Sequence, residues 1–334
     1  MAKIALNFED GFTRIIEGWN GETVANTAYR LGINVPLDCG DGACGTCKCK
    51  VRSGQYDLGD EYIEDALSEE EAANGFALAC QMKPQSDVVV DIFASSTACK
   101  IKSETIATTI ESIEFPSPEI VKLVVKPTDR KLINFLAGQY ANIEVPNSGK
   151  TRSYSFSSLS GSNSLEFLVR LVPYGLMSDY LKNEAKVGET LTLSAPFGSF
   201  YVRESDKPML FFAGGTGIAP FLSMLETLAI NGSKQAIQLF YGATTDENLV
   251  EIARLDEFKK KLPFDYSLCV SAEKSEKYAN GFVTQWISKQ HLPDSYEAYI
   301  CGPPPMVDAV KDSISSEGIE LSNFYMEKFV PTGN

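Results

Sequence analysis

The stretch Cys39-Gly40-Asp41-Gly42-Ala43-Cys44-Gly45-Thr46-Cys47 places three thiols on one short loop, and Cys80 follows 33 positions after Cys47. Four residues separate the first two cysteines and two separate the next pair, which is the plant-type spacing of ligands to a [2Fe–2S] cluster. Three ligands on one tight loop can wrap one side of two irons, while a distant fourth closes the other side. The sequence therefore predicts a [2Fe–2S] cluster held by Cys39, Cys44, Cys47 and Cys80.

Zinc is the alternative metal for these cysteines. Zinc sites prefer paired knuckles with few residues between ligands, and this loop has one such pair behind a glycine-rich lead-in. Glycines let backbone amides approach the sulfur atoms of a redox centre, so iron–sulfur binding is favoured. Cys49 is a competing ligand, because a strand after the loop would point Cys47 and Cys49 to the same face. We assign Cys49 to packing, and Cys99 to a linker without a role.

Composition indicates a globular chain of more than one domain. The chain has 334 residues, of which 44% are hydrophobic and 22% charged, and its formal net charge is −14. This acidic balance argues against the basic surface that nucleic-acid binding needs. No apolar run is long enough to span a membrane, and Glu9 and Asp10 interrupt the first apolar stretch before a signal peptide could form. We expect a cytoplasmic protein that binds neither nucleic acid nor membrane.

The first predicted domain spans residues 1–98. Two alternating apolar runs, Ile4–Phe8 and Thr13–Ile16, flank a glycine and predict a hairpin. Helical spacing of apolar residues predicts a helix over Glu22–Leu31, and Val88–Phe93 predicts a closing strand. The cysteine loop lies between them, so this block is the predicted iron–sulfur domain.

A polar linker over residues 99–104 separates this block from two others. Residues 105–203 hold many short strand runs interrupted by proline and glycine, a pattern typical of a barrel. Residues 204–334 alternate apolar strand runs with helical stretches, which predicts a parallel sheet with crossover helices. The expected strands and helices of this last block are Met209–Ala213, Pro220–Ile230, Ile237–Tyr241, Tyr266–Val270, Tyr296–Cys301 and Met306–Ser315.

The middle block carries the motif Arg152-Ser153-Tyr154-Ser155-Phe156-Ser157. A planar guanidinium suits a pyrophosphate, and an aromatic face can cover a flavin ring. On this motif the sequence resembles the ferredoxin–NADP reductase superfamily. The resemblance implies bound FAD, with Arg152 on its pyrophosphate, Tyr154 on its ring and a catalytic Ser155 near its reactive nitrogen. A surface ion pair for Arg152 and ordinary barrel packing for Tyr154 are the alternatives.

A second segment supports the same resemblance. Val169-Arg170-Leu171 leads through Gly175, Met177 and Ser178, and this segment is similar to the superfamily's turn around the flavin pyrophosphate. Ser178 is expected at a helix start, where free backbone amides bind phosphate. The flavin-binding residues that the resemblance adds are Val169, Arg170, Gly175, Met177 and Ser178.

The last block opens with a glycine turn between a strand run and a helical pattern, Gly214-Gly215-Thr216-Gly217-Ile218-Ala219-Pro220. Such a turn lets phosphate approach amides at a helix N-terminus, and it resembles the superfamily's G-G-T-G-x-x-P signature. A second signature, Cys301-Gly302-Pro303-Pro304-Pro305-Met306, ends the last predicted strand. The residues implied to line a nicotinamide site are Gly214, Gly215, Thr216, Gly217, Gly302, Pro303 and Met306.

Cys301 is implied to lie close to the path of the hydride. A small buried apolar residue is the plain interpretation of such a cysteine, and it is compatible with that role. A thiolate nucleophile is not expected, because His291 is the only histidine of the chain and no base is paired with Cys301.

NADH is the expected nicotinamide cofactor. In NADP-dependent relatives a Ser-Arg pair after the third strand meets the 2′-phosphate, whereas the comparable stretch here is Val270-Ser271-Ala272-Glu273. Alanine replaces the arginine, and Glu273 would repel phosphate. Asp246, which follows the second strand run, suits a free ribose hydroxyl. Lys274 and Lys277 lie nearby and argue the other way.

Near its C-terminus the chain reads Met326-Glu327-Lys328-Phe329. The superfamily places a terminal aromatic side chain against the flavin face and a glutamate two residues earlier near the nicotinamide. The resemblance therefore implies that Phe329 and Glu327 join the catalytic residues, with Phe329 displaced when nicotinamide stacks on the flavin. Simple packing of a C-terminal tail is the alternative for Phe329.

The order of the three blocks resembles reductases of two-component aromatic ring-hydroxylating dioxygenases, of the benzoate and anthranilate 1,2-dioxygenase type. The implied fold class is a β-grasp-like [2Fe–2S] ferredoxin domain, an antiparallel β-barrel flavin domain and a parallel-sheet α/β nicotinamide domain. The implied function is an NADH-dependent reductase that passes electrons through FAD and a [2Fe–2S] cluster to a terminal oxygenase of the Rieske type. We expect it to act as a monomer.

Two other functions stay open. Reductases of di-iron monooxygenases, such as the phenol and methane enzymes, share this domain order, and the electron acceptor distinguishes them. A non-catalytic redox sensor would use the cluster as a switch, and repeated turnover of NADH with an artificial acceptor would exclude it. The aromatic substrate belongs to the oxygenase, so the chain does not specify it.

Overall fold

The computed structural model describes residues 1–37, 40–43, 45–64, 66–272, 274–288, 292, 295–318 and 323–329. The chain forms two compact units. The first comprises Met1–Glu104 with Ala195–Ser199, and the second comprises Thr105–Ser194 with Phe200–Asn334. Across the described ranges, no helix is long and apolar enough to cross a membrane.

The first unit is built on a mixed five-stranded sheet with the order β2-β1-β7-β3-β5. The predicted hairpin is present, because β1 pairs antiparallel with β2, and β1 also pairs parallel with β7. Helix α1 starts at a Thr23 cap and buries Val24, Ala25 and Ala28 in the core of this unit. The elements of the unit are β1 (Ala2–Phe8), β2 (Thr13–Gly18), α1 (Val24–Arg30), β3 (Lys48–Ser53), β4 (Tyr56–Asp57), α2 (Glu69–Ala73), β5 (Phe76–Leu78), β6 (Lys83–Pro84), β7 (Val88–Ile92) and a 3-10 turn at Ala98–Lys100.

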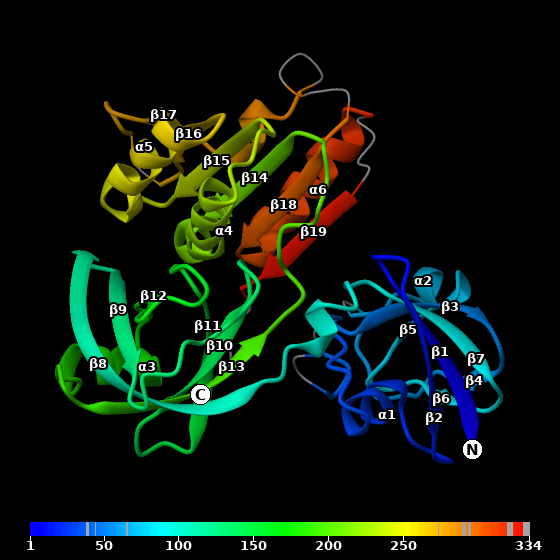
Figure 1. The fold of residues 1–334 in the computed structure, drawn as a ribbon. Helices are drawn as coiled ribbons and strands as arrows, with labels where there is room; N and C mark the ends of the chain where they lie inside the picture. The colour runs from blue at the N-terminus through cyan, green and yellow to red at the C-terminus, as the bar shows by residue number, and fades with distance from the viewer. Residues whose placement is uncertain are drawn as a thin grey trace. The chain divides into compact units, whose positions relative to one another are not determined.

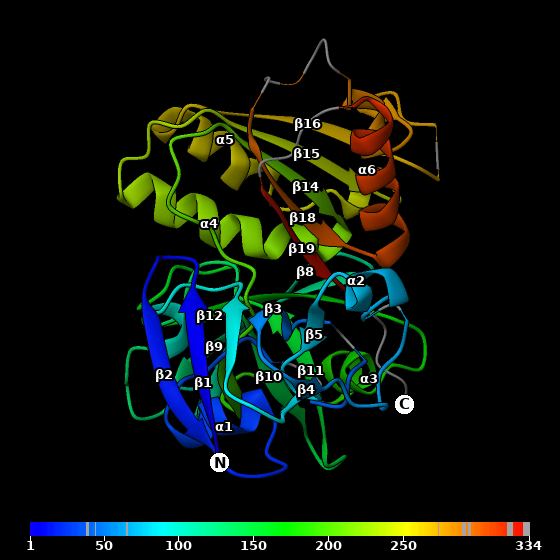
Figure 2. The ribbon, with the colours of Figure 1, turned by 90° about the vertical axis from the view of Figure 1, so that its right-hand side faces the viewer.

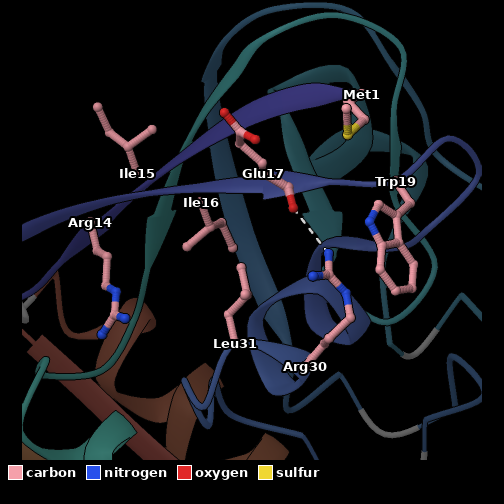
Figure 3. Close-up of a pocket in the computed structure, with 8 residues that line it drawn as sticks. All are labelled: Met1, Arg14, Ile15, Ile16, Glu17, Trp19, Arg30 and Leu31. Carbon is pink, nitrogen blue, oxygen red and sulfur yellow. Dashed lines mark hydrogen bonds between the residues drawn. The ribbon is translucent and has the colours of Figure 1, made fainter.

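A surface hollow of about 370 Å³ lies between β2 and the end of α1 (Figure 3). Arg30 forms one wall and is fully engaged: its guanidinium pairs with Glu22 at 2.8 Å and covers the Trp19 ring at 4.0 Å. It also donates to the Glu17 carbonyl at 3.0 Å. These contacts engage the Arg30 guanidinium within the protein, on the side of the hollow that faces α1.

The first half of the second unit is a curled antiparallel sheet with the order β11-β10-β13-β8-β9-β12 (Figure 1). Its two edge strands approach one another where Phe156, just after β11, forms a bridge with Phe167 of β12. Phe135 stacks on Phe156 at 3.9 Å and fills the interior. The elements are β8 (Glu104–Ser117), β9 (Ile120–Pro127), β10 (Tyr140–Val145), β11 (Lys150–Ser155), β12 (Leu165–Arg170), α3 (Leu176–Asn183) and β13 (Thr190–Phe197).

The second half is a parallel sheet with the order β17-β16-β15-β14-β18-β19. Its four central strands are the four that the sequence predicts. Strand β19 was not expected. It forms the edge of the sheet opposite β17 and pairs parallel with β18. The elements are β14 (Met209–Gly214), α4 (Ile218–Ile230), β15 (Ile237–Ala243), α5 (Ile252–Lys261), β16 (Phe264–Val270), β17 (Ala279–Asn280), β18 (Glu297–Gly302), α6 (Pro304–Ser316), β19 (Asn323–Lys328) and 3-10 turns at Gly215–Gly217, Asp246–Asn248 and Val283–Trp286.

Helices cover both faces of this parallel sheet, with α4 and α5 on one side and α6 on the other (Figure 2). Alternation along β14 explains the two layers, since successive side chains of a strand point to opposite faces. Phe211 belongs to the core that contains α4 and α5, whereas Phe212 belongs to the core that contains Val307 and Val310 of α6. The apolar run Met209–Ala213 is therefore buried on both faces, as parallel strands require.

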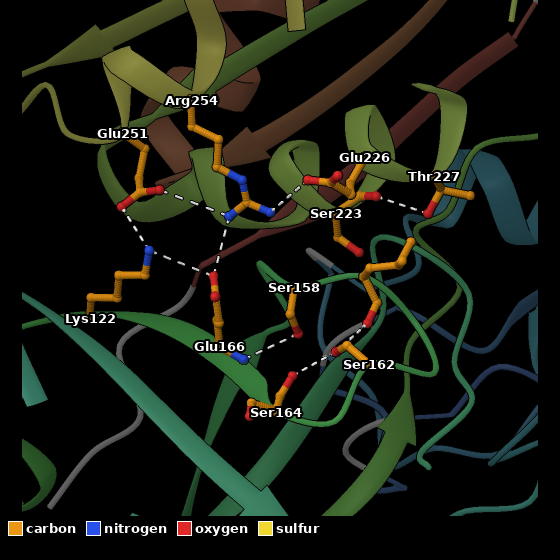
Figure 4. Close-up of polar contacts among 11 residues, drawn as sticks. Lys122, Ser158, Ser162, Ser164, Glu166, Ser223, Glu226, Thr227, Glu251 and Arg254 are labelled. Atoms are coloured by element: carbon orange, nitrogen blue, oxygen red, sulfur yellow. Dashed lines mark hydrogen bonds and ion pairs between the residues drawn. The ribbon is translucent and has the colours of Figure 1, made fainter. Parts of the chain in front are cut away.

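A charged cluster joins the two halves of the second unit (Figure 4). Arg254 of α5 contacts Glu166 of β12 at 3.3 Å and Glu226 of α4 at 3.4 Å. Lys122 of β9 contacts Glu251 at 3.4 Å. The side chains are between 12% and 28% exposed, so water screens these pairs less than it screens surface pairs. We call this set of five residues the Arg254 cluster.

Candidate functional site

Two of the four predicted cluster ligands converge from different elements of the first unit. Cys47 precedes β3 and Cys80 follows β5, and their sulfur atoms lie 3.2 Å apart in a buried position. A hydrogen bond from the Cys47 thiol lowers the pKa of Cys80 to about 7, and the Gly42 amide adds to this effect. Paired, buried sulfur atoms with an amide directed at one of them fit a [2Fe–2S] cluster. Cys39 and Cys44 lie outside the described residues.

The glycines of the loop are required by close backbone contacts. A Cβ at Gly42, where φ is +87°, would lie 2.2 Å from the Glu61 carbonyl oxygen. A Cβ at Gly45, where φ is +71°, would lie 3.1 Å from the Ala66 carbonyl oxygen. The segment after β4 therefore packs directly on the loop that carries the ligands, and a side chain at Gly42 would push it away.

The two other cysteines of the first unit are core residues. The Cys49 thiol is buried and donates to the Ala77 carbonyl at 3.4 Å, and burial raises the pKa of the Cys49 thiol to about 12. Cys99, which the sequence places in a linker, is also buried in this core, and its carbonyl accepts from the Asn34 amide at 2.7 Å. The chain near Cys99 is therefore part of the first unit. The polar composition of this segment did not reveal that its one cysteine is buried.

The predicted flavin motif lies on β11, the edge strand of the curled sheet. Arg152 and Tyr154 share one face of the strand and both are partly buried, while Ser155 at its end is 4% exposed. Register pairing with β10 sets Arg152 opposite Ile143 and Tyr154 opposite Ala141. The Arg152 and Tyr154 side chains thus lie on the same face of the strand, two positions apart.

The second flavin segment forms a turn into α3. Val169 is buried and Arg170 exposed at the end of β12, and Met177 is buried in the first turn of the helix. The Ser178 hydroxyl accepts from the Val172 amide at 2.9 Å and braces the turn. The first backbone amides of α3 have no acceptor within the helix, as at every helix start, and can bind phosphate.

A Cβ at Gly175 would lie 2.6 Å from Val172 Cγ2 and 3.0 Å from the Ser178 hydroxyl. Glycine therefore lets the turn close onto the helix start. This contact accounts for Gly175 in the predicted flavin segment.

The two nicotinamide signatures meet at the carboxyl edge of the parallel sheet. The chain leaves β14 toward β15 on one side, and β18 returns on the other side, so the turns after β14 and β18 flank the switch point where α/β sheets bind ligands. A Cβ at Gly217 would lie 2.2 Å from the Cys301 carbonyl oxygen. A Cβ at Gly214 would lie 2.5 Å from Met306 Sδ and 3.0 Å from Pro303 Cδ.

Gly302 lies against Gly214 in the same contact, because a Cβ at Gly302 would approach the Gly214 Cα to 3.2 Å. Thr216 and Gly217 form a buried 3-10 turn that leads into α4. A glycine turn at a helix start of this kind directs backbone amides toward a phosphate. The predicted set from Gly214, Gly215, Thr216 and Gly217 to Gly302, Pro303 and Met306 is thus brought together at one edge.

Ser155, Cys301 and Glu327 converge although they belong to three different strands. The Ser155 hydroxyl donates to Glu327 Oε2 at 3.0 Å, and the Cys301 thiol donates to the same oxygen at 3.7 Å. Cys301 also faces Glu327 across the β18–β19 register. Burial, reinforced by the Glu327 charge, raises the pKa of the Cys301 thiol well above its usual value, so the thiol stays neutral.

Phe329 follows β19 directly and is partly buried against the core of the parallel sheet. Its amide donates to the Gly302 carbonyl at 2.9 Å. The aromatic residue is therefore tied to the turn that carries the second nicotinamide signature. Residues 330–334 lie outside the described residues.

Asp246 begins the 3-10 turn after β15, at the same carboxyl edge as the glycine turn. Its Oδ2 accepts from the Ser275 hydroxyl at 3.0 Å. Ser275 was not among the predicted site residues. The backbone amides of Lys277 and Tyr278 donate to its hydroxyl and form a Ser-initiated turn. Glu273 lies outside the described residues.

These sites define an oxidoreductase with three cofactor-binding parts. Residues 7–85 match the 2Fe-2S iron-sulfur cluster binding domain family. Residues 108–201 match the oxidoreductase FAD-binding domain family, and residues 211–312 match the oxidoreductase NAD-binding domain family. The chain therefore has a domain for each of the three predicted cofactors.

The whole chain is similar to proteins with the same three parts. It is 48% identical to the toluate 1,2-dioxygenase electron transfer component of Pseudomonas putida over 98% of both chains. It is 39% identical to the anthranilate 1,2-dioxygenase electron transfer component of Acinetobacter baylyi, over 98% of this chain and 97% of the relative. The chain belongs to this family of electron transfer components, as the motifs predict. The Amycolatopsis cytochrome P450 reductase GcoB has the same fold, with a TM-score of 0.76 and 28% identity over 98% of this chain and 99% of that one.

Proposed function

We propose that this chain takes electrons from NADH and delivers them to the terminal oxygenase of an aromatic-ring 1,2-dioxygenase. The convergence of Ser155, Cys301 and Glu327 is the observation that carries the proposal. These residues connect the end of β11, which carries the predicted flavin motif, to the ends of β18 and β19 at the predicted nicotinamide site. All three strands belong to one compact unit. A hydride can pass between two cofactors only when their reacting atoms are held about 3–3.5 Å apart, and this junction is where the two predicted cofactor sites meet.

The chain's own residues divide into holding and orienting roles. Bound FAD supplies the chemistry that accepts a hydride and releases single electrons, which no side chain can supply. Arg152 would pair with the pyrophosphate, the first amides of α3 would donate to it, and Tyr154 would cover the flavin ring. Ser155 holds a proton on Oγ that it can direct to the flavin in place of Glu327. The neutral, buried Cys301 thiol would fill space beside a bound nicotinamide and exclude water.

Phe329 is proposed to cover the flavin face until the nicotinamide replaces it. Its amide bond to the Gly302 carbonyl anchors the backbone, so only the ring needs to move. Exclusion of water by an aromatic face protects the reduced state between turnovers. The partly buried position of the ring is consistent with this role.

Cys39, Cys44, Cys47 and Cys80 are proposed to hold the [2Fe–2S] cluster, and Cys49 to remain a core residue. The proximity of Cys47 and Cys80 supports the first assignment. The buried hydrogen bond of Cys49 to Ala77 supports the second. The substitution Cys80→Ser should abolish the cluster absorbance and electron delivery to the oxygenase while leaving NADH-driven ferricyanide reduction. The control Cys49→Ala should keep the cluster.

NADH is proposed as the electron donor in preference to NADPH. Asp246 lies at the carboxyl end of the second strand of the parallel sheet, where an acidic side chain binds the ribose hydroxyls of NAD. A 2′-phosphate placed there would meet a carboxylate and be repelled. A higher specificity constant for NADPH would contradict this proposal.

The electron acceptor is proposed to be an oxygenase of the Rieske type. Support comes from the level of identity: 48% to a dioxygenase component, against 34% to the xylene/toluene monooxygenase electron transfer component of Pseudomonas putida. Reconstitution with purified Rieske oxygenases and with a di-iron monooxygenase distinguishes the two acceptors. Turnover with the monooxygenase alone would overturn the dioxygenase assignment.

An anaerobic NADH titration tests the core of the proposal. Absorbance and EPR spectra should show one flavin and one [2Fe–2S] centre per chain, both reduced by NADH. Sustained NADH turnover with ferricyanide excludes a redox sensor. A flavin that stays oxidised in excess NADH would overturn the function. The monomeric state and the cytoplasmic location remain predictions from the sequence.

A further inference from the structure

We propose that Ser275 is a positioning residue for cofactor choice: its hydroxyl fixes Asp246 as an acceptor for the ribose 2′-hydroxyl, so that rejection of a 2′-phosphate depends on Ser275 as well as on Asp246. The inference rests on the proposed use of NADH and extends it to a residue outside the predicted site. Ser275 and Asp246 are 29 positions apart and lie in the loops that follow β16 and β15.

The direction of the Ser275 hydrogen bond follows from counting protons. The Ser275 hydroxyl oxygen accepts from the Lys277 amide at 3.0 Å and from the Tyr278 amide at 2.9 Å. A hydroxyl has two acceptor lone pairs and one proton. Both lone pairs are used, because backbone amides can only donate. The single proton therefore goes to Asp246 Oδ2, at 3.0 Å.

Ser275 is itself held at both ends of its backbone. Its amide donates to the Asn280 side-chain oxygen at 2.8 Å, and its carbonyl accepts from the Asn280 side-chain nitrogen at 3.2 Å. Asn280 lies in β17, which pairs with Val270 of β16. The loop between the two strands is thus closed on the sheet, and the hydroxyl has one available direction.

The charges around Asp246 make its orientation matter. Lys277 lies over the Tyr278 ring at 4.8 Å, and the Tyr278 and Asp246 groups raise the pKa of the Lys277 amine. A carboxylate that turned away would no longer offset the Lys277 amine, and Glu276 would be the remaining described acidic residue between Lys274 and Lys277. A 2′-phosphate would then be repelled less than it is now. The Ser275 hydrogen bond keeps the carboxylate in the repelling position.

Binding of cofactor fragments tests the proposal without hydride transfer. Calorimetry with ADP-ribose and with 2′-phospho-ADP-ribose gives the preference of the full chain for the fragment without the phosphate. For Ser275→Ala we expect this preference to fall roughly tenfold, because a hydrogen bond to a charged group is lost. Ser275→Thr, which keeps the hydroxyl, should restore it. Ser112→Ala removes a comparable hydroxyl–carboxylate bond, to Glu114 at 3.2 Å in the curled sheet, and should change nothing.

The pair of substitutions Asp246→Ala and Ser275→Ala separates positioning from loop damage. If Ser275 acts through Asp246, its substitution adds no further change in preference once Asp246 is alanine. The proposal fails if Ser275→Ala leaves the preference at the wild-type value, or lowers it equally in the Asp246→Ala background. A wild-type chain that prefers 2′-phospho-ADP-ribose would overturn the proposed use of NADH itself. NADH-dependent flavin reduction, measured in parallel, shows whether the reductase function stands.

Discussion

The Ser155 hydroxyl donates to Glu327 Oε2 over 3.0 Å, across 172 positions of sequence. Ser155 ends β11 of the curled sheet and Glu327 lies in β19 of the parallel sheet. The hydrogen bond therefore ties the predicted flavin strand to the edge of the predicted nicotinamide site. Both groups are among the predicted catalytic residues, and they lie far apart in the sequence.

Replacing Ser155 with alanine should slow flavin reduction by NADH roughly tenfold or more, because a hydrogen bond next to the reacting atoms is lost. Stopped-flow absorbance at saturating NADH measures the rate. Ser153 lies on the same strand, and its hydroxyl donates to Asn142 at 2.6 Å, so Ser153→Ala is the matched control. Equal rates for the two variants would exclude a role for Ser155 in hydride transfer.

Gly217 and Gly214 should differ in their tolerance of alanine. The Cβ at Gly217 would meet the backbone oxygen of Cys301, which cannot move without shifting β18. The Cβ at Gly214 would meet chiefly the end of the flexible Met306 side chain, although Pro303 is also close. We expect Gly217→Ala to cost about 1–3 kcal/mol of stability, and Gly214→Ala less. Urea unfolding measures both, and the reverse order would contradict the close contact between the two turns.

Arg254 should contribute more to stability than a surface cation does. Its removal leaves Glu166, Glu226 and Glu251 close together with Lys122 as the remaining cation of the cluster. We expect Arg254→Ala to cost about 1–3 kcal/mol, between the values for exposed and buried pairs. Lys260→Ala is the control, because its pair with Glu257 is more than half exposed and its loss should change stability far less. Similar unfolding midpoints for both variants would contradict a stabilising role of the Arg254 cluster between the two halves of the second unit.

Cys99 should make the first unit less stable in alkali. Burial raises the pKa of its thiol from 9.0 to about 12, and Asp10 and Glu9 add to the effect. The folded chain keeps the thiol proton, while the unfolded chain releases it above pH 9, so this stability is complete below pH 9 and is lost as the pH rises toward 12. Between pH 8 and pH 10 the thermal midpoint of the wild type should fall more than that of Cys99→Ala. Parallel curves would show that the thiol is not held neutral.

The fold was largely predictable because its signals are local. The strand run at Met209–Ala213 is apolar along its whole length, as a strand buried on both faces must be, and Glu297 is the one charged residue of the run Tyr296–Cys301. Strand β19 was missed because it lies at the sheet edge and reads Asn-Phe-Tyr-Met-Glu-Lys, with too few apolar residues to stand out from a tail. Its pairing is set by β18, which is a tertiary effect.

The site was predictable where a motif carries its own chemistry. The glycine turn at Gly214–Gly217 and the Cys301 signature are such motifs, and the structure brings them into contact. Ser275 was missed because its role depends on a loop closure that aligns it with Asp246 of another loop. The bracing role of the Ser178 hydroxyl was likewise invisible, since the motif gives a helix start but not the direction of a side chain.

The burial of Cys301 affects how readily its thiol is oxidised in air. Peroxide and related oxidants attack thiolates far faster than neutral thiols, and they need access to the sulfur. Cys301 is fully buried and holds its proton beside Glu327. A chain that hands electrons to an oxygen-using partner works where partially reduced oxygen forms. The Cys301 sulfur is thereby protected from oxidation. The Glu327 carboxylate, which accepts from Ser155, also helps to keep this thiol protonated.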